Sequence, residues 1–277
     1  MKPFFSIIIP TLNEEKLLPD LLTDLAHQKN RDFETIIVDG HSTDKTVLVA
    51  NGFKKKLALL RVVTSDKANL CYQRNLGAEK SLGSYLVFLD ADIRIFPTFL
   101  YEIHKKIKSS GALFLTTYQL PDVNDQFDIF LMQLANYTLE LLKLINKQMA
   151  PGYNIIVHRD KFKLIKGFDE KTTFSEDHDL SMRLYKKGVE LIIIPKRLLK
   201  WSFRRMKKHG PLPIIMKYAF ATLYSIIFGK ITDKDFGYPM GGAYFSEALS
   251  KTNFNLKGDL HKYFLKIQKT FKKLFVE

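Results

Sequence analysis

The 277-residue sequence predicts an α/β protein with a mostly parallel sheet flanked by helices, followed by a helical carboxyl-terminal extension. Short β-rich runs alternate with helix-like segments from the amino terminus to about residue 115, a pattern typical of parallel strands joined by helices. The runs are almost continuously apolar, as expected of strands buried on both faces. Hydrophobic residues make up 46% of the chain, enough to form a large core.

Five strands and three helices are expected in this part of the chain. Leucines recur at helical spacing over residues 14–28, and Asn13 is in position to cap that helix. The other two helices are expected over residues 44–53 and 69–81. The strands are expected over residues 5–9, 34–38, 58–63, 85–89 and 112–118. In an open sheet of this order, ligands bind at the carboxyl ends of the strands.

An acidic pair, Asp90 and Asp92, follows the fourth expected strand. Two carboxylates one residue apart on an extended segment project to the same side, so both can face one divalent cation. Their oxygens suit Mg²⁺ or Mn²⁺, and such an ion leaves positions for the oxygens of a diphosphate. A solvated acidic strand end is the alternative interpretation of this short motif taken alone.

Polar loops follow the first two expected strands at the same edge. Asp39 can accept a hydrogen bond from a nucleobase N–H, and Gly40 allows the backbone to approach a ligand closely. Ordinary turn chemistry explains each loop taken alone. The residues concerned are Pro10, Thr11, Asn13 and Glu14 after the first strand, and Asp39 and Gly40 after the second.

The composition of the chain and the motifs that it lacks limit the functions that the protein can have. The net charge of +14 favours polyanionic partners, namely nucleic acid, anionic lipid headgroups or phosphorylated substrates. The sequence has no glycine-rich dinucleotide fingerprint, no P-loop and no Cys/His pairs spaced for zinc. Cys71 is the only cysteine, which fits a reducing compartment. The first residues do not read as a secretion signal, so we expect a cytoplasmic location.

Six sequence blocks, in order, resemble the inverting family 2 glycosyltransferases, over about residues 4–205. That family has the GT-A fold, a Rossmann-like, mostly parallel sheet flanked by helices. Together the blocks are far more specific than any one of them. They are SIIIPTLNEE at 6–15, VDGHSTDKT at 38–46, RNLGA at 74–78, LDAD at 89–92, GYNIIVHR at 152–159 with GFDE at 167–170, and EDHDLSMRL at 176–184.

The resemblance implies a donor site for a nucleotide-sugar, most often a UDP-sugar. Asp92 would hold Mg²⁺ or Mn²⁺, and Asp90 would bind the ribose or a metal-bound water. Asp39 suits uracil without excluding guanine. Arg204 and Arg205 would reach the diphosphate, or would belong to a solvated or lipid-contacting basic run. Besides these, the residues implied on the donor side are Pro10, Thr11, Asn13, Glu14 and Arg74.

On the acceptor side, the resemblance implies that Asp177 is the general base, with Gly152, Asn154 and Glu176 nearby. Inverting transfer needs a base on the side of the sugar opposite the departing diphosphate. A metal ion would neutralise that leaving group. Acidic residues at 176–179 also suit a helix amino terminus, and Arg183 is placed to pair with Asp179 one turn away.

The expected organisation is a catalytic domain over residues 1–205, with a nucleotide-binding half to about 118 and an acceptor half over 119–205. Residues 206–277 would form an amphipathic helical extension. Residues 127–145 carry one polar stripe, leaving a wide apolar face. Apolar residues also repeat at helical spacing between lysines over 256–274. Both segments suit packing on the protein or peripheral contact with an anionic membrane. The polar stripe is Gln133, Asn136, Glu140 and Lys143.

From these features we hypothesise a peripheral enzyme on the cytoplasmic membrane face, acting on a lipid-linked acceptor or a cell-surface polysaccharide precursor. Two alternatives stay open, namely a catalytically silent GT-A scaffold and a basic nucleic-acid-binding protein. Asp39, Asp92 and Asp177 are all present, which favours an active enzyme. Most aromatic residues lie within apolar periodic segments, so we expect no nucleic-acid partner.

Overall fold

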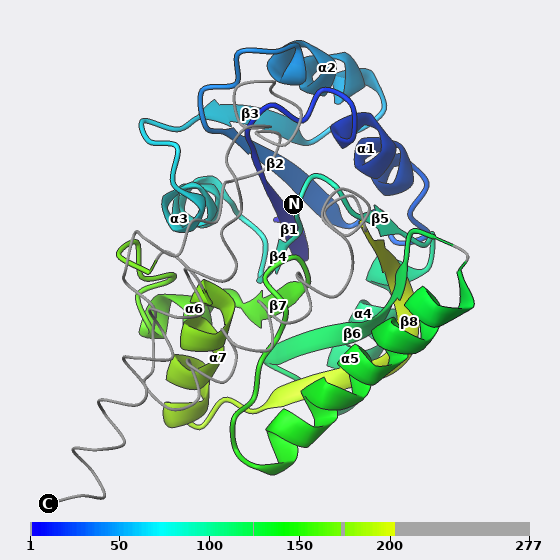
Figure 1. Ribbon diagram of the computed structural model, residues 1–277. Helices are drawn as coiled ribbons and strands as arrows, with labels where there is room; N and C mark the ends of the chain where they lie inside the picture. The colour runs from blue at the N-terminus through cyan, green and yellow to red at the C-terminus, as the bar shows by residue number, and fades with distance from the viewer. Residues whose placement is uncertain (1, 124, 173–174, 203–277) are drawn as a thin grey trace, which may run out of the picture.

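The computed structural model describes residues 2–123, 125–172 and 175–202 (Figure 1). Arg204, Arg205 and the expected extension at 206–277 lie outside these residues. The described strands form one eight-stranded sheet in the order β3-β2-β1-β4-β7-β6-β8-β5. Their bounds are β1 (Phe5–Thr11), β2 (Phe33–Asp39), β3 (Leu60–Thr64), β4 (Tyr85–Phe88), β5 (Arg94–Ile95), β6 (Phe114–Pro121), β7 (Ile155–His158) and β8 (Leu191–Trp201).

The first four strands confirm the expected parallel unit. β1 lies between β2 and β4 and runs parallel to both, and β3 runs parallel to β2. Every residue of β1 and β2 is buried, as the continuous apolar runs predict. In this register, Thr11 at the end of β1 lies opposite Asp39 at the end of β2.

The remaining strands continue the same sheet with mixed directions. β7 lies between β4 and β6 and is antiparallel to both. β8 runs parallel to β6, and the two-residue β5 pairs antiparallel with β8. The sequence analysis did not predict β5, β7 or β8, although β7 lies inside the GYNIIVHR block. Because β7 reverses direction, Ile155 at its start pairs with Phe88 at the end of β4.

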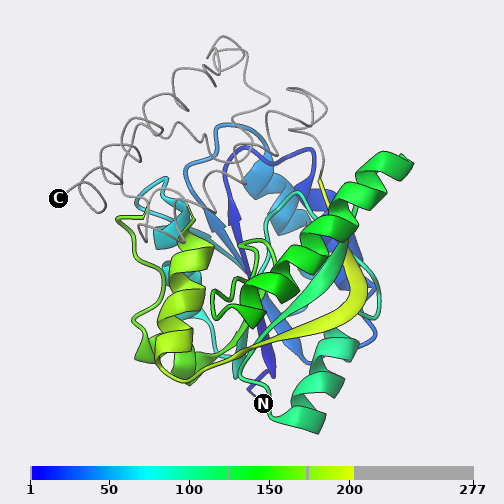
Figure 2. The same cartoon turned by 60° about the horizontal axis from the view of Figure 1, so that its bottom comes forward.

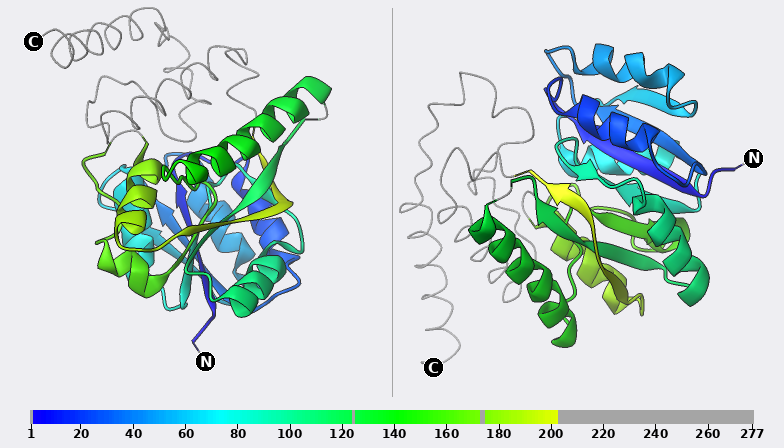
Figure 3. Two further views of the ribbon diagram at one scale, coloured as in Figure 1. Left: turned by 90° about the horizontal axis from the view of Figure 1, so that it is seen from below. Right: turned by 90° about the vertical axis from the view of Figure 1, so that its right-hand side faces the viewer.

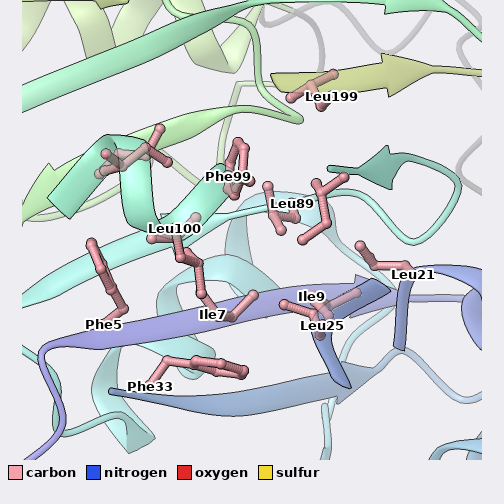
Figure 4. Close-up of a cluster of buried hydrophobic side chains, with 14 of the residues drawn as sticks. Phe5, Ile7, Ile9, Leu21, Leu25, Phe33, Leu89, Phe99, Leu100 and Leu199 are labelled. Atoms are coloured by element: carbon pink, nitrogen blue, oxygen red, sulfur yellow. The ribbon is translucent and has the colours of Figure 1, made fainter. Parts of the chain in front are cut away.

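Helices cover both faces of the sheet (Figure 1). Residues 5, 7 and 9 of β1 pack with α1 and α4 in one buried cluster (Figure 4), whereas Ile8 packs with α3, α6 and α7 in the other. This division follows from the alternation of side chains along a strand. The helices are α1 (Leu18–Ala26), α2 (Thr46–Gly52), the 3₁₀ turn η1 (Phe53–Lys55), α3 (Leu70–Lys80), α4 (Phe99–Ser110), α5 (Gln126–Leu144), α6 (Arg159–Leu164) and α7 (Glu176–Lys186).

The expected cap of the first helix was wrong. α1 begins only at Leu18, with Leu17 in the capping position. Asn13 adopts a left-handed backbone with φ 55°, and its side-chain oxygen accepts from the Thr43 N–H instead. The local cap is lost because that oxygen joins two loops. By contrast, Asn69 does cap α3 by accepting from the Tyr72 N–H at 2.9 Å.

The expected helix at residues 127–145 is confirmed as α5, and two residues of its polar stripe, Asn136 and Glu140, face β6 beside the buried Met132, Leu139 and Leu142. Asn136 is buried and bonds both backbone groups of Gln119, at 3.1 and 2.9 Å. Glu140 accepts from the Tyr118 hydroxyl at 3.1 Å. Figure 2 shows α5 lying across β6 and β8, and Figure 3 shows α4 on the other side of the sheet. Within the described residues, no helix is both long and apolar enough to cross a bilayer.

Gly77 lets α3 lie directly on the sheet. A Cβ added there would overlap the Ile8 side chain and lie 3.0 Å from Val38 Cγ2. Both neighbours are fully buried in β1 and β2, where packing leaves little room for adjustment.

We therefore expect Gly77→Ala to lower the free energy of unfolding by about 1–3 kcal/mol, because overpacking outweighs the gain in helix propensity. Gly52→Ala is the matched control, since a Cβ there meets nothing within 4 Å; it should raise stability by about 0.5–1 kcal/mol. Urea unfolding of both variants measures the difference. Equal effects would contradict this account of α3.

Candidate active site

Asp39 is held rigidly at the carboxyl edge of the sheet. Both Asp39 and Thr11 are 2% exposed. Asp39 Oδ1 accepts from Ser42 Oγ at 2.6 Å and from Thr11 Oγ1 at 3.2 Å, while Oδ2 accepts from the Ser42 N–H at 2.9 Å. A carboxylate oxygen can accept two hydrogen bonds, so Oδ2 keeps capacity for a ligand N–H.

The loops after β1 and β2 form one hydrogen-bonded unit. The Asn13 N–H donates to Ser42 Oγ at 2.9 Å, and Asn13 Oδ1 accepts from the Thr43 N–H at 2.8 Å. Glu14 is buried, and its N–H donates to Thr46 Oγ1 at 2.8 Å. The first two sequence blocks therefore meet at one edge, where Pro10 is also buried within β1.

Gln73 of α3 fastens the two strand ends together. Its Nε2 donates to the Thr11 carbonyl at 3.0 Å and to the Val38 carbonyl at 2.7 Å. A Cβ at Gly40 would lie 2.9 Å from the same nitrogen. Gly40 therefore makes room for this crosslink, in addition to any close approach to a ligand.

The acidic pair lies at the next strand end, although not in the expected conformation. β4 ends at Phe88, and Ala91 and Asp92 lie in a turn. The alternation of side chains along an extended segment therefore does not apply to Asp90 and Asp92, and that part of the prediction was wrong. Both side chains are partly exposed, and Asp90 Oδ1 accepts from Arg74.

Arg74 is the central charge of the site. It is 1% exposed, and its Nη2 donates to Asp90 Oδ1 at 2.9 Å while Nη1 donates to Glu176 Oε1 at 2.8 Å. Its guanidinium carbon lies 5.2 Å from the centre of the Phe168 ring. Burial lowers the pKa of Arg74, but the Asp90 and Glu176 carboxylates raise it by more. The guanidinium therefore stays charged.

Asp177 lies in the first turn of α7, beside Glu176. Its Oδ2 accepts from the Gly152 N–H at 3.0 Å, and its Oδ1 accepts from the His178 N–H at 2.8 Å. Burial, followed by the Glu176 carboxylate, raises the pKa of Asp177 to about 7; the two N–H groups and Arg74 act in the opposite direction. A carboxyl group with this pKa can accept a proton at neutral pH.

The GFDE loop is clamped between α3 and α7. Asn75 exchanges two hydrogen bonds with the Phe168 backbone, both at 2.9 Å. Arg183 donates to the carbonyls of Ile165 and Gly167 at 2.7 and 2.6 Å. Arg183 also forms the expected pair with Asp179, at 2.8 Å. These contacts place the Phe168 ring against Arg74.

Gly152 and Asn154 precede β7 and therefore lie at the same edge as Asp90. A Cβ at Gly152 would lie 3.1 Å from both Arg74 Nη2 and Glu176 Oε1. Asn154 is fully buried, and its Nδ2 donates to the backbone carbonyl and the hydroxyl of Thr117, at 3.1 and 3.0 Å. Its expected role toward an acceptor stays a prediction.

The structure thus assembles most of the expected residues into two connected groups. Thr11, Asn13, Glu14 and Asp39 form one group, and Arg74, Asp90, Gly152, Glu176 and Asp177 form the other. Helix α3 joins them, because Gln73 contacts the first group and Arg74 the second. Gln73 and Asn75 were not among the site residues expected from the sequence. The pattern that could have indicated them is a run of three consecutive polar residues, 73–75, in a helix expected to cover the sheet.

The acidic turn fits a metal ion that is completed by its substrate. Among the described residues, no group of three or more His, Cys, Asp or Glu side chains gathers as around an enclosed metal ion. Asp90 and Asp92 offer two hard carboxylates. Mg²⁺ is commonly held by one or two carboxylates together with substrate phosphates, so this donor set suits it.

Comparison with known proteins agrees with this architecture. The chain matches the family model described as Glycosyl transferase family 2 over residues 6–165. A PGL/p-HBAD biosynthesis glycosyltransferase from Mycobacterium tuberculosis is 41% identical over 188 residues, covering 66% of this chain and 70% of that protein.

Two solved structures share the fold. A fragment of Staphylococcus aureus TarS in complex with UDP-GlcNAc gives a TM-score of 0.62 at 20% identity, over 100% of this chain and 76% of the fragment. The longer TarS chain is covered over 41% of its length. The mannosyltransferase PcManGT from Pyrobaculum calidifontis, in complex with GDP-Man and Mn²⁺, gives a TM-score of 0.64 at 16% identity, over 100% of this chain and 84% of that chain.

These structural neighbours are GT-A glycosyltransferases, which confirms the expected fold. The family model covers more than half of the chain, and it includes the first four motif blocks, the GYNIIVHR block and strands β1 to β4. With the sheet, the motif order and the mycobacterial relative in agreement, the chain belongs to glycosyltransferase family 2.

Proposed function

We propose that this glycosyltransferase is metal-dependent and inverting, and that it moves a sugar from a UDP-sugar to a hydroxyl acceptor with Asp177 as general base. The proposal rests on the environment of the Asp177 carboxyl. Two backbone N–H groups fix it, its pKa is raised to about 7, and Glu176 and Arg74 connect its helix to Asp90.

The first group of residues would bind the nucleotide. Asp39 presents Oδ2 toward a nucleobase N–H, and the joined loops at residues 10–14 and 39–46 enclose the base and ribose. The UDP-GlcNAc complex of TarS supports a UDP-sugar, and the GDP-Man complex of PcManGT keeps a GDP-sugar as the alternative. Mg²⁺ or Mn²⁺, held by Asp92 with Asp90, would supply Lewis-acid stabilisation of the diphosphate.

The second group would carry out the transfer. As the acceptor oxygen forms a bond to the anomeric carbon, the bond from that carbon to the diphosphate breaks on the opposite side. The acceptor proton passes to an oxygen of Asp177, whose carboxylate the Gly152 and His178 N–H groups keep oriented. Positive charge develops on the sugar in such a transition state, by analogy with glycoside hydrolysis.

Asp177→Asn tests the base. The amide keeps the size of the side chain but accepts no proton, so kcat should fall by about 10²–10⁴-fold while nucleotide binding persists. Steady-state kinetics and nucleotide titration measure the two effects. Asp160→Asn, at an exposed aspartate of α6, is the control. Parental turnover in Asp177→Asn would remove Asp177 from this role and, with it, the proposed mechanism.

Asp92→Ala tests the metal-dependent donor site. A ligand that binds only the folded protein raises its melting temperature, so a UDP-sugar with Mn²⁺ should stabilise the parental protein more than the UDP-sugar alone. In Asp92→Ala this extra increment should disappear. Thermal unfolding with a panel of UDP- and GDP-sugars, with and without Mn²⁺, measures it. An unchanged increment in Asp92→Ala would contradict the metal assignment.

We further propose that α5 contacts an anionic lipid surface and that the acceptor is lipid-linked, which would place the protein on the cytoplasmic membrane face. The outward side of α5 is apolar, and none of the exposed residues of this helix is charged. More than half of each apolar side chain on this side is exposed. They are Phe127, Phe130, Leu134, Tyr137, Leu141 and Leu144, followed by Ile145.

Charge selects a lipid surface as the occupant of this face. Residues 203–277 hold 14 of the 43 Lys and Arg residues but five of the 29 Asp and Glu residues. The described chain ends beside α5, since the Asp122 N–H donates to the Trp201 carbonyl at 3.0 Å just before that helix. An apolar helix face, in a chain whose residues 203–277 are strongly basic in sequence, suits anionic membranes, where each basic residue near the surface contributes about 1 kcal/mol.

Flotation with vesicles containing anionic lipid tests this contact. The parental protein should float, and Phe130→Glu combined with Leu134→Glu should abolish flotation, because two charges would have to enter the lipid interface. Leu48→Glu, at a still more exposed leucine of α2, should still float. If the folded parental protein stays at the bottom, or if the double variant floats equally well, α5 does not bind lipid.

A further inference from the structure

Arg74 connects three parts of the site that are far apart in sequence. It belongs to α3, Asp90 follows β4, and Glu176 begins α7. Both ion pairs are shorter than 3 Å, and the guanidinium is 1% exposed. Asp90 and Glu176 are 36% and 16% exposed, so the carboxylates face the site while the guanidinium lies behind them.

We propose that Arg74 is a positioning residue that couples the acidic turn at residues 90–92 to the base-bearing turn of α7. This inference rests on the proposed role of Asp177. The sequence resemblance implied a donor-binding role for Arg74, but its burial and its two protein partners favour action through Asp90 and Glu176. The donor site and the base would then be held in register by one side chain.

The shape of guanidinium explains why arginine occupies this position. Its two Nη atoms donate in fixed, separate directions, so each can bond a different carboxylate. Phe168 covers one face of the group. The loop before β7 packs closely against both ion pairs, because a Cβ at Gly152 would lie 3.1 Å from Arg74 Nη2 and from Glu176 Oε1. A lysine ammonium has one nitrogen and cannot reproduce this planar fork.

Arg74 and Glu176 also affect Asp177 in opposite directions. The Glu176 carboxylate raises the pKa of Asp177, and the Arg74 guanidinium lowers it. Removing one charge while keeping the approximate size of its side chain should therefore move the acidic limb of the kcat profile in a direction that depends on which charge is removed. A purely structural role would lower activity without this opposite pair of shifts.

The experiment compares pH profiles of kcat for Arg74→Gln and Glu176→Gln. The acidic limb lies near pH 7 in the parental enzyme if Asp177 must be deprotonated. It should move up by about one unit in Arg74→Gln and down by about one unit in Glu176→Gln. Arg94→Gln is the matched control, because Arg94 bonds Asp24 and lies close to Asp20 outside the site. Its profile should not move.

Arg74→Lys separates charge from geometry. It keeps the positive charge, so its acidic limb should stay close to the parental position, while kcat falls at least tenfold and the donor KM changes less than threefold. Shifts in the same direction for both Gln variants, or a rise in donor KM alone, would overturn the proposal. Should Arg74→Gln fail to fold in thermal unfolding, Glu176→Gln and Arg74→Lys still decide the outcome.

The inference and the proposed mechanism fail in different ways. If Asp177→Asn keeps parental turnover, Asp177 is not the base and the proposed function falls. If Asp177→Asn is inactive but the acidic limb stays in place in Glu176→Gln and Arg74→Gln, the mechanism stands and the coupling role of Arg74 falls.

Discussion

The site depends on one buried guanidinium shared by two carboxylates. Removing Arg74 from water costs several kcal/mol, and pairing offsets that cost only when partners approach with good geometry. Asp90 and Glu176 supply such partners, one at each Nη atom. Both carboxylates must therefore stay in place beside Arg74. This requirement fixes the position of the turn after β4 relative to the start of α7. Asp177 follows Glu176 directly, so the ion pair between Glu176 and Arg74 also fixes the position of the candidate base.

Sheet topology explains how these segments can meet. β1, β2 and β4 run parallel and end at one edge, so Thr11 and Asp39, the last residues of β1 and β2, lie at the same edge as Asp90, which follows β4. β7 runs antiparallel to β4, which brings its amino end, and hence Gly152, to that same edge. A parallel β7 would have placed the acceptor block at the opposite edge. The change of strand direction between β4 and β7 is thus what brings the loop before β7 to the edge where β1, β2 and β4 end.

The sequence predicted the parallel strands, and it marked most residues that the structure brings together in the candidate site, because their signals are local. Buried strands read as apolar runs, and their polar ends read as motifs. β5, with two residues, and β7, with four, are too short for periodicity to reveal. β8 is longer, but the exposed Pro195, Lys196 and Arg197 interrupt its apolar run. Asn13 failed as a helix cap because Thr43, thirty residues away, competes for its oxygen. The ion pairs of Arg74 join residues separated by 16 and 102 positions, and local patterns do not encode such contacts.

The orientation of α5 follows from the strand beneath it. Pairing of β6 with β8 shifts register on both sides of Tyr118, and the next residue, Gln119, has its backbone N–H and carbonyl bonded by the buried Asn136 side chain. A buried backbone group left unpaired costs about 1–3 kcal/mol, so these bonds favour turning the polar stripe of α5 inward. With Asn136 and Glu140 directed at β6, helical geometry sends Phe130, Leu134 and Tyr137 outward. Hydrogen bonding at an irregular strand thus acts together with the burial of Met132, Leu139 and Leu142 on the inner side of α5, and the apolar outer face is what remains exposed.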